Sequence, residues 1–375
     1  MEANVRFFPI GNADTCLVDA GGCKFVFDFA APTLQGGDDR RIDLAQALRA
    51  EFENEGRDSI DVASFSHLDS DHFAGASEFF HLEHAEKYQG PGRIRIKEMW
   101  VPAAAILESK WDQSPEGRVI QAEARHRLRE GKGIRVISRP EVLNDWLRNQ
   151  GIAPGARRNL IVGAGDLMPG FSLESTGIEF FVHAPFSDQR DESEVDRNGE
   201  CTVFHATIKD GPGQVKLMLT GDSPYDVLGR IVETSEKAGN QDRLEWDIIK
   251  VPHHSSYRSL SPERGDSVTT PVPSVGRLYE KYGNTAGTIV SPSKTIPSSD
   301  EILPPHRQAA EYYKKAAQNI AGHYLVTMEH PAKESPRPVN LKVSGRGLGV
   351  ALEKVAPTVT GAVITSPPRA GDHGY

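Results

Sequence analysis

The chain has 375 residues, of which 38% are hydrophobic and 25% charged, and its formal net charge is −9. This composition fits a globular protein with room for one large α/β sandwich or two domains, with a core big enough to fold unaided. No run of about 18 apolar residues occurs, and the N-terminus lacks a basic region followed by an apolar one, so we expect neither a membrane helix nor a signal peptide. The three cysteines form no Cys-x-x-Cys pair, which indicates reduced thiols and a cytoplasmic location.

The first predicted helix covers residues 42–52. Leu44, Leu48 and Phe52 form one apolar stripe there, which would pack on a β-sheet. An apolar run over residues 62–66 then predicts a buried strand.

The end of that strand carries the most informative motif of the chain. It reads His67-Leu68-Asp69-Ser70-Asp71-His72, which places four metal-capable side chains within six residues. Imidazole nitrogens and carboxylate oxygens suit Zn²⁺, Mn²⁺ or Fe²⁺, and when buried together they need a cation to offset the cost of desolvation. A polar turn that caps the next helix would explain one Asp but not two between two His. The motif therefore predicts a metal site in the crevice at a strand end.

A basic segment follows the motif. Residues 86–160 contain fifteen Lys and Arg against nine Asp and Glu, a local charge of +6 that leaves −15 for the remainder. One helix is predicted at about 116–129. Its arginines, Arg125 and Arg129 among them, would either guide a phosphodiester backbone by charge or form the solvated outer face of a helix.

Two later strand ends carry further candidate ligands. The predicted strand 215–219 runs into Asp222, ahead of a helix that Ser223 and Pro224 would open. The predicted strand 246–251 is followed closely by the adjacent pair His253 and His254.

The ordered set of these motifs resembles the metallo-β-lactamase superfamily of hydrolases, closest to the hydrolase domain of bacterial competence (DNA-uptake) channels and its stand-alone relatives. The residues that carry the resemblance are 8–18, 25–28, 67–72, 197–203, 219–222 and 249–256. It implies an αββα four-layer sandwich of two mixed β-sheets over residues 1–355, with a basic helical insertion at about 86–165. Residues 356–375, rich in Gly, Pro and Ser, are expected to form a disordered tail.

The resemblance also implies the role of each motif residue. His67 and Asp69 would bind a first metal ion, Asp71 and His72 a second one, and Asp222 would bridge the two. Asp69 stands where many members of the superfamily have His, although competence-type relatives also carry Asp.

The motifs at residues 197–203 and 249–256 leave alternatives open. Either His254 or His253 would complete the second site, and the other would contact the substrate or support the ligand. The histidine that the family carries in the 197–203 motif is not obvious here, because Asn198 occupies its place by spacing. His183, at a predicted strand end, is either a substitute ligand or a histidine bonded to the backbone. Asp28 would support the site structurally. An oxygen-rich first site shifts the preference from Zn²⁺ toward Mn²⁺ or Mg²⁺, with one or two cations per chain.

Together these features predict a metal-dependent hydrolase, in which a divalent cation lowers the pKa of a bound water to about 7. Asp71 would orient the nucleophile, and the unligated one of His253 and His254 would donate to a phosphoryl oxygen. A phosphodiesterase or nuclease acting on DNA, RNA or nucleotides is favoured. The candidate substrate contacts are Lys294, His306, Arg125 and Arg129. The alternatives are a small-molecule ester, lactone or phosphoester hydrolase, and a non-catalytic module of this fold in a multi-protein assembly.

Overall fold

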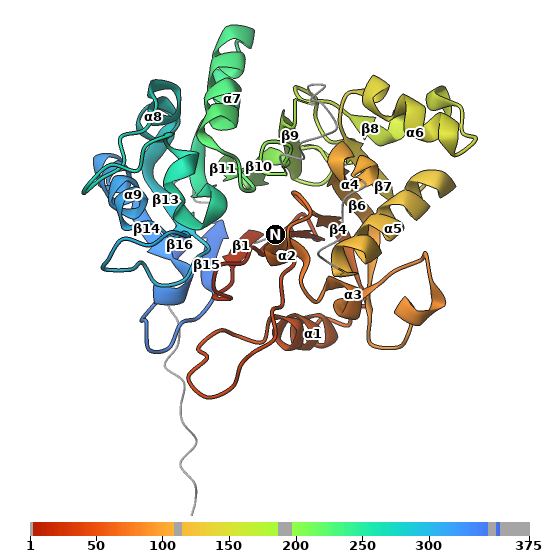
Figure 1. The fold of residues 1–375 in the computed structure, drawn as a ribbon, viewed down its shortest axis with the longest axis horizontal. Helices are drawn as coiled ribbons and strands as arrows, with labels where there is room; N and C mark the ends of the chain where they lie inside the picture. Colours follow the sequence, from red (N-terminus) through yellow and green to blue (C-terminus); the bar gives the residue numbers. More distant parts are fainter. Residues whose placement is uncertain (1–2, 109–114, 187–196, 344–349, 353–375) are drawn as a thin grey trace, which may run out of the picture.

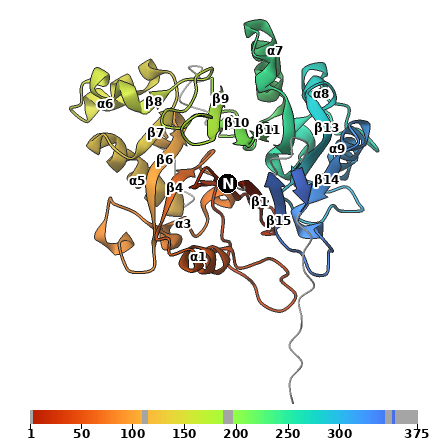
Figure 2. The same cartoon turned by 180° about the vertical axis from the view of Figure 1, so that it is seen from behind.

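The computed structural model describes residues 3–108, 115–186, 197–343 and 350–352. Two β-sheets pack face to face, and α7, α8 and α9 lie on one side of the molecule while α1, α5 and α6 lie on the other (Figures 1 and 2). The predicted αββα sandwich is confirmed. In the described part of the chain, no helix is long and apolar enough to cross a membrane.

The larger sheet has the strand order β16-β15-β1-β2-β3-β4-β6-β7-β8, with β5 paired to β6. Its strands are β1 (Ala3–Phe7), β2 (Cys16–Ala20), β3 (Cys23–Phe27), β4 (Ser59–Ser64), β5 (Phe80–His81), β6 (Ile94–Pro102), β7 (Ile134–Ile137), β8 (Ile161–Val162), β15 (Val339–Val343) and β16 (Val350–Leu352). Strands β3, β4, β6, β7 and β8 run parallel, whereas β1 pairs antiparallel with β2 and β15, so the sheet is mixed.

The smaller sheet has the order β14-β13-β12-β11-β10-β9. Its strands are β9 (Ile178–Ala184), β10 (Val203–Asp210), β11 (Gly213–Leu219), β12 (Trp246–Lys250), β13 (Gly283–Ser291) and β14 (His323–Val326). Strands β11 to β14 run parallel, so the ends of β11 and β12 that carry the predicted ligands meet at one edge of this sheet.

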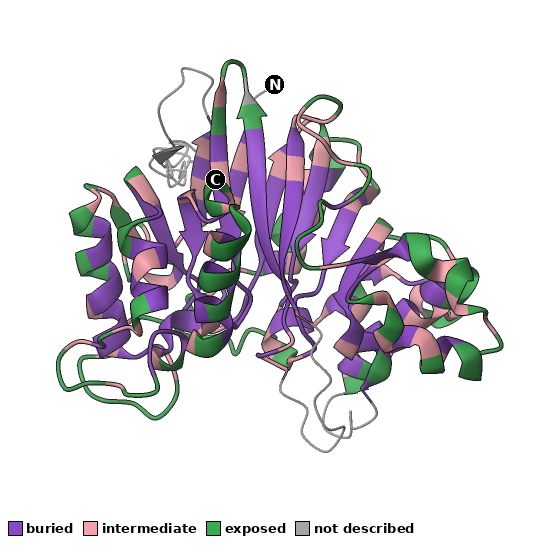
Figure 3. Cartoon of the chain, turned by 90° about the horizontal axis from the view of Figure 1, so that it is seen from above, coloured by how far each residue is buried: buried purple, intermediate pink, exposed green. Residues whose placement is uncertain are grey.

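The helices cover the outer face of each sheet. They are α1 (Leu44–Asn54), α2 (Ser70–Phe73), α3 (Ala76–Phe79), α4 (Ala103–Leu107), α5 (Pro115–Glu130), α6 (Asn144–Asn149), α7 (Tyr225–Ala238), α8 (Pro273–Glu280) and α9 (Arg307–Asn319). Their apolar faces enter one core with the larger sheet and another with the smaller sheet. Figure 3 shows the buried strands in the middle and exposed outer faces on the flanking helices.

A third core lies between the two sheets and follows from strand alternation. Phe25 and Phe27 of β3 face this core, while Val26 between them faces the helices. Trp100 of β6 lies at its centre and is fully buried. The rings around Trp100, with centroids 5.2 to 6.4 Å away, are those of Phe25, Phe27, Phe171, Phe180 and Phe204. This packing joins the sheets, whose edges then meet at the site.

The predicted elements differ from the observed ones in two places. The one helix expected after the 67–72 motif is broken into α2 and α3, because Gly75 has a φ of 77° and ends the first turn. The segment 86–165 contains α5 close to the predicted bounds, but it also contributes β6, β7 and β8 to the larger sheet. The segment 86–165 is therefore an integral part of the sandwich. The predicted disordered tail, 356–375, lies outside the described residues.

The inter-sheet core predicts a large stability effect at its centre. Trp100→Ala should lower the free energy of unfolding by about 3–5 kcal/mol, because it leaves a cavity among five aromatic rings. Leu167, whose surface is 45% exposed, provides the control, and Leu167→Ala should change stability by no more than about 0.5 kcal/mol. Chemical denaturation followed by tryptophan fluorescence and circular dichroism measures both. Equal shifts in the two variants would contradict the assignment of Trp100 to the core.

Candidate metal centre

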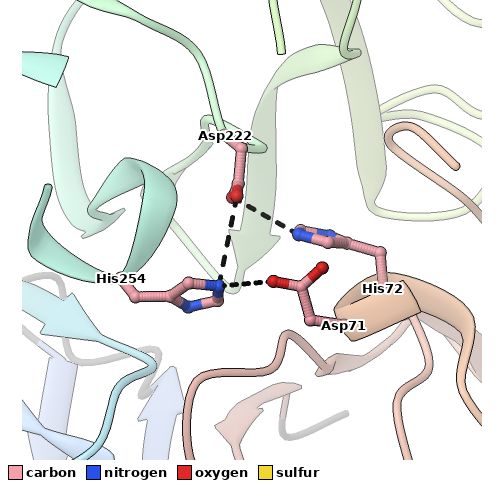
Figure 4. Close-up of side chains that lie close together, drawn as sticks. All are labelled: Asp71, His72, Asp222 and His254. Atoms are coloured by element: carbon pink, nitrogen blue, oxygen red, sulfur yellow. Dashed lines mark hydrogen bonds and ion pairs between the residues drawn. The ribbon is translucent and has the colours of Figure 1, made fainter. Parts of the chain in front are cut away.

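Four side chains from distant parts of the chain gather at the edge where the sheets meet. Asp71 and His72 lie on the short helix α2 after β4, Asp222 follows β11, and His254 lies in the turn Pro252–Ser255 after β12. One ligand atom from each of the four lies within 4.8 Å of those of the other three (Figure 4). The larger sheet thus supplies two of the side chains and the smaller sheet the other two.

The distances within the cluster suit a single small cation. The Nε2 atom of His254 lies 3.0 Å from Oδ2 of Asp71 and 4.0 Å from Oδ2 of Asp222. The Nε2 atom of His72 lies 3.4 Å from Oδ1 of Asp222. His72, Asp222 and His254 are almost fully buried, whereas the side chain of Asp71 is 34% exposed. The cluster is therefore closed on the protein side and opens to solvent at Asp71.

The two histidines are held with one ring nitrogen aimed at the cluster. His72 donates its Nδ1–H to Oδ2 of Asp28 at 2.9 Å, and His254 donates its Nδ1–H to the carbonyl oxygen of Pro292 at 2.7 Å. Asp28 also accepts the backbone N–H and the hydroxyl of Ser66. A histidine that donates from one nitrogen to a carboxylate or carbonyl presents the other nitrogen to a metal, which is the usual arrangement around metal ions.

Orphaned polar atoms test whether a cation fits. The Nε2 atoms of His72 and His67 are buried and have no hydrogen-bond partner in the part of the chain that the structure describes. Such atoms carry a desolvation cost that a ligand would remove. Two carboxylates and two imidazoles match the preferences of Zn²⁺ and Mn²⁺ better than those of Mg²⁺, which favours oxygen ligands alone. The residues of the cluster fit a divalent cation.

The charges of the cluster act strongly on one another. Burial lowers the pKa of His72, but the nearby carboxylates of Asp28, Asp222 and Asp71 raise it by more than burial lowers it. The net pKa therefore lies well above the usual value. The pKa of His254 is raised in the same way by Asp71 and Asp222 against the effect of burial. Without a cation, protons on the two rings therefore balance the carboxylates.

The backbone around the cluster is strained. Asp28 has a φ of 54°, and the consecutive residues His253, His254 and Ser255 have φ values of 48°, 53° and 64°. Left-handed conformations cost L-residues free energy, and they persist where surrounding contacts fix them, often at functional sites. Gly221 has a φ of 51°, and a Cβ there would lie 3.0 Å from Sγ of Cys201. The turn that presents Asp222 thus requires glycine.

A buried ion pair that the sequence did not reveal supports the cluster. Lys250, at the end of β12, pairs with Asp14 and donates to the carbonyl oxygen of Gly221 at 2.7 Å. Its Nζ atom also lies 3.7 Å from Oδ1 of Asp222. A single Asp in a loop and a single Lys in an apolar strand carry no spacing signal, so only the fold brings them together.

The structure distinguishes the two candidate ligands His253 and His254 by their positions. His254 lies inside the cluster, whereas the side chain of His253 is 30% exposed and its Nε2 lies 4.0 Å from Oδ2 of Asp222. The backbone N–H of His253 donates to Oδ1 of Asp222 at 3.2 Å. Burial lowers the pKa of His253, so its ring is neutral near pH 7 at the rim of the site.

The residues predicted for a first metal ion lie beside the cluster. His67 packs against His72 with ring centroids 4.0 Å apart, and its Nε2 lies 3.6 Å from Oδ2 of Asp69. Asp69 is not part of the four-residue cluster, since its Oδ1 accepts a hydrogen bond from Arg197 at 2.7 Å. Asn198 has a buried Oδ1 without a hydrogen-bond partner among the described residues, and its role as a ligand stays a prediction.

Two other predicted histidines do not reach the site. His183, predicted as a substitute ligand, donates from its Nε2 to the carbonyl oxygen of Arg243 at 2.9 Å. Side chains alternate along β9, so Phe180 and Val182 face the inter-sheet core and His183 points the other way. His306 was considered as a substrate contact. Both of its ring nitrogens are hydrogen-bonded within the protein, and its ring is buried.

A cleft of about 750 Å³ opens next to Asp71. Its lining residues are Ile10, Gly11, Asn12, Ala13, Ala30, Pro32, Gln35, Gly36, Asp38, Asp39, Arg40, Arg41, Ser70, Asp71, Ala74, Lys294 and Met328. The predicted contact Lys294 therefore lines the same cleft as Asp71. Arg125 and Arg129 lie on α5 and do not line this cleft.

Comparisons with known proteins agree with this architecture only distantly. No protein-family model and no curated protein matches the sequence. Among solved structures, the CmlA β-hydroxylase has a TM-score of 0.43 and 11% identity over 91% of this chain, which spans only 54% of that chain. Igni18, a metallo hydrolase from the archaeon Ignicoccus hospitalis, has a TM-score of 0.36 and 11% identity over 91% of this chain and 98% of that chain. YhfI from Bacillus subtilis, a metallo-β-lactamase fold protein, has a TM-score of 0.38 and 11% identity over 91% and 100%.

The two mixed sheets and the two outer helical layers form a four-layer αββα sandwich. The chain thus has a buried His and Asp cluster at the edge where the two sheets of this sandwich meet.

Cation binding should stabilise the folded chain. At about 100 times the dissociation constant, Zn²⁺ or Mn²⁺ should raise the free energy of unfolding by about 2.7 kcal/mol, and a chelator should reverse the gain. His254→Ala should abolish this gain because it removes one of four clustered groups. His183→Gln is the matched control and should keep the full gain. Thermal unfolding with and without cation measures the effect, and an equal loss in both variants would contradict the assignment.

The raised imidazole pKa values predict that cation binding releases protons. The folded pKa of His72 lies above the unfolded value of 6.5, so its stabilisation of the metal-free protein is full below pH 6.5 and is lost as the pH rises through the folded pKa. A cation needs the neutral ring, so its affinity should increase as the pH rises across the same window. Isothermal titration calorimetry in buffers of different ionisation enthalpy should give about one to two protons released per cation near pH 7.

The control for proton release is again a histidine outside the cluster. Burial lowers the pKa of His183 to about 4, so this ring is already neutral at pH 7. His183→Gln should therefore leave the proton count unchanged. Cation binding without proton release in the unmodified protein would show that His72 and His254 are neutral before binding.

Proposed function

We propose that the chain is a divalent-metal-dependent hydrolase whose substrate is a phosphodiester of nucleotide size. One observation carries the proposal: the four-residue cluster opens at Asp71 onto a cleft of about 750 Å³. A site for chemistry and a space for a substrate therefore adjoin. Clefts of about 300–1,000 Å³ are the usual size for small ligands.

The cluster would hold the cation through Asp71, His72, Asp222 and His254. A divalent cation in such a site stabilises developing negative charge and lowers the pKa of water to about 7. The protein contributes the fixed geometry, since Asp28 and Pro292 orient the two imidazoles. The exposed edge of Asp71 is the side from which a substrate would approach, and its carboxylate would orient the attacking water.

His253 is placed to move a proton. Its ring lies at the rim, partly exposed, with a pKa lowered by burial so that it is neutral near pH 7. A neutral imidazole near the operating pH can accept a proton from water or pass one to a leaving oxygen. His254 has no such freedom, because both of its ring nitrogens are engaged inside the cluster.

The cleft supplies positive charge for a phosphate. Lys294 is exposed, lines the same cleft as Asp71, and has no ion-pair partner among the residues that the structure describes. Its backbone N–H donates to Oδ1 of Asn12, which fixes the loop. Arg40 donates to a backbone carbonyl and keeps its charge, whereas Arg41 is neutralised by Asp39. Lys294 and Arg40 thus favour an anionic substrate.

The basic segment offers less support for a long nucleic acid than its charge suggests. Its arginines mostly bind the protein itself. Arg125 donates to the carbonyl oxygens of Ile106 and Glu108, and Arg127 is buried against Glu123. Arg135 pairs with Glu98, and the side chains at positions 93 and 157 donate to backbone carbonyls. The proposal is therefore centred on nucleotides or short oligonucleotides, as the competence-type resemblance and the cleft together favour.

A second candidate function is hydrolysis of an uncharged ester or lactone. The observation that favours it is the apolar part of the cleft. The residues that form this part are Ile10, Ala13, Ala30, Pro32, Ala74 and Met328. A non-catalytic module, in contrast, would have no need for orphaned imidazole nitrogens beside an open cleft. Less than one bound cation per chain, by elemental analysis, would favour that third role.

Activity on chromogenic substrates separates the candidates. With Mn²⁺ or Zn²⁺, we expect cleavage of bis(p-nitrophenyl) phosphate and of p-nitrophenyl thymidine monophosphate, abolished by Asp71→Ala. Lys294→Ala should lower kcat/KM for these anions about tenfold to hundredfold, since a charged hydrogen bond contributes about 1.5–3 kcal/mol. It should not affect p-nitrophenyl acetate, which is uncharged.

Lys237→Ala provides the control, because this lysine is exposed in the last turn of α7 and does not line the cleft. It should leave all rates unchanged. Metal-dependent cleavage of the acetate with no cleavage of either phosphodiester would replace the proposal by the second candidate.

A further inference from the structure

We propose that the guanidinium group of Arg197 takes the place of a second metal ion, so that the site binds one divalent cation per chain. This inference rests on the proposed metal-dependent function and specifies the composition of its site. It concerns the His67 and Asp69 side of the cluster, where the resemblance implied a first metal ion. The structure places an arginine there.

The contacts of Arg197 join the two acidic groups of this region. Its Nη1 donates to Oδ1 of Asp69 at 2.7 Å, and its Nη2 donates to Oε1 of Glu108 at 2.9 Å. Its Nε lies 3.2 Å from the same Glu108 oxygen. A guanidinium that engages a carboxylate through two nitrogens is held in one orientation. Asp69 is therefore already paired with the permanent positive charge of Arg197.

Glu108 is a fixed partner. Its side chain is 2% exposed, and its backbone carbonyl accepts hydrogen bonds from Gln121 and Arg125 of α5. A buried carboxylate without its counter-charge is strongly unfavourable, so Arg197 cannot leave Glu108 without a large loss of stability. The basic segment thus has a structural role at the site, because its helix α5 positions Glu108, which in turn holds Arg197.

A metal ion bound between His67 and Asp69 would lie next to this guanidinium. The Asp69 carboxylate spans the two, with Oδ1 on Arg197 and Oδ2 3.6 Å from Nε2 of His67. Like charges that share one carboxylate repel each other. The side chains of Asp69 and Arg197 are each 33% exposed, so water weakens this repulsion in part, whereas His67 on the other side of Asp69 is buried. The fixed arginine therefore excludes the second metal ion.

The arginine would also act on the substrate side. Arg197 reaches the cluster through Asp69 and His67, whose ring packs on His72. The side chain of Arg197 is 33% exposed, so its positive charge can attract an anionic group at the surface of the site. The buried Nε2 of His67, which has no hydrogen-bond partner within the described ranges of the chain, is then left for a hydrogen bond to the substrate or to water.

The test counts metal ions instead of turnover. The protein is loaded with Mn²⁺ and analysed by elemental analysis, calorimetry and electron paramagnetic resonance. We expect about one ion per chain and the spectrum of an isolated Mn²⁺ ion. Asp69→Asn should change the affinity by no more than about threefold, whereas Asp71→Asn should lower it by about a hundredfold or more.

A double variant tests the arginine directly. Arg197→Ala alone would leave Glu108 buried and unpaired, so Arg197→Ala is combined with Glu108→Gln to keep the fold. This variant should bind a second, weaker Mn²⁺ ion through the released Asp69.

Each other outcome overturns a defined claim. Two ions in the unmodified protein, a spin-coupled pair, or a more than tenfold loss of affinity in Asp69→Asn would overturn the inference but leave a metal-dependent hydrolase. A stoichiometry of one in the double variant would show that Arg197 is not what excludes the second ion. Absence of any bound ion would overturn the proposed function itself.

Discussion

The burial of negative charge at the meeting edge of two sheets is the constraint on which the site depends. Asp14, Asp28 and Asp222 are nearly inaccessible to water, and Asp71 is two-thirds covered. Each needs compensation, because an isolated carboxylate is costly in a medium of low dielectric constant. Lys250 compensates Asp14, and the hydroxyl and imidazole groups around Asp28 satisfy its oxygens. Asp222 lies 3.4 Å from the ring of His72 and 3.7 Å from the ammonium group of Lys250, and Asp71 lies 3.0 Å from the ring of His254. The imidazoles beside these two carboxylates must carry protons or share a cation.

The fold creates this concentration of charge and also restrains it. The β4, β11 and β12 ends belong to different sheets, so the inter-sheet core around Trp100 sets how closely they approach. Locally, Gly221 permits the turn before Asp222, and three successive left-handed residues turn His254 inward. Packing free energy thus maintains a backbone that would be unfavourable in a free peptide. The geometry of the site is therefore stiff, which a preorganised hydrolytic centre requires.

The sequence was sufficient for the parts of the site that repeat a local pattern. The 67–72 motif, and the strand-end positions of Asp222 and His254, follow from apolar runs that end in polar ligands. It was insufficient where partners come from distant segments without periodicity. Arg197 follows no pattern that predicts a pair with Asp69, and the charge of the basic segment did not reveal that its arginines bind backbone carbonyls. The fold class was predictable from motif order, whereas β6, β7 and β8 were hidden in a segment interpreted by its charge.

A guanidinium and a metal ion differ as sources of positive charge in one respect that bears on function. The guanidinium group of arginine stays protonated at every physiological pH, so its charge is constant and is not removed by a chelator. A metal ion exchanges with solvent, and its affinity depends on proton release from the ligating imidazoles. In the proposed site only one of the two positive charges would be exchangeable. The activity would then follow the occupancy of a single ion, while Arg197, anchored by Glu108, keeps the Asp69 side of the site charged and ordered.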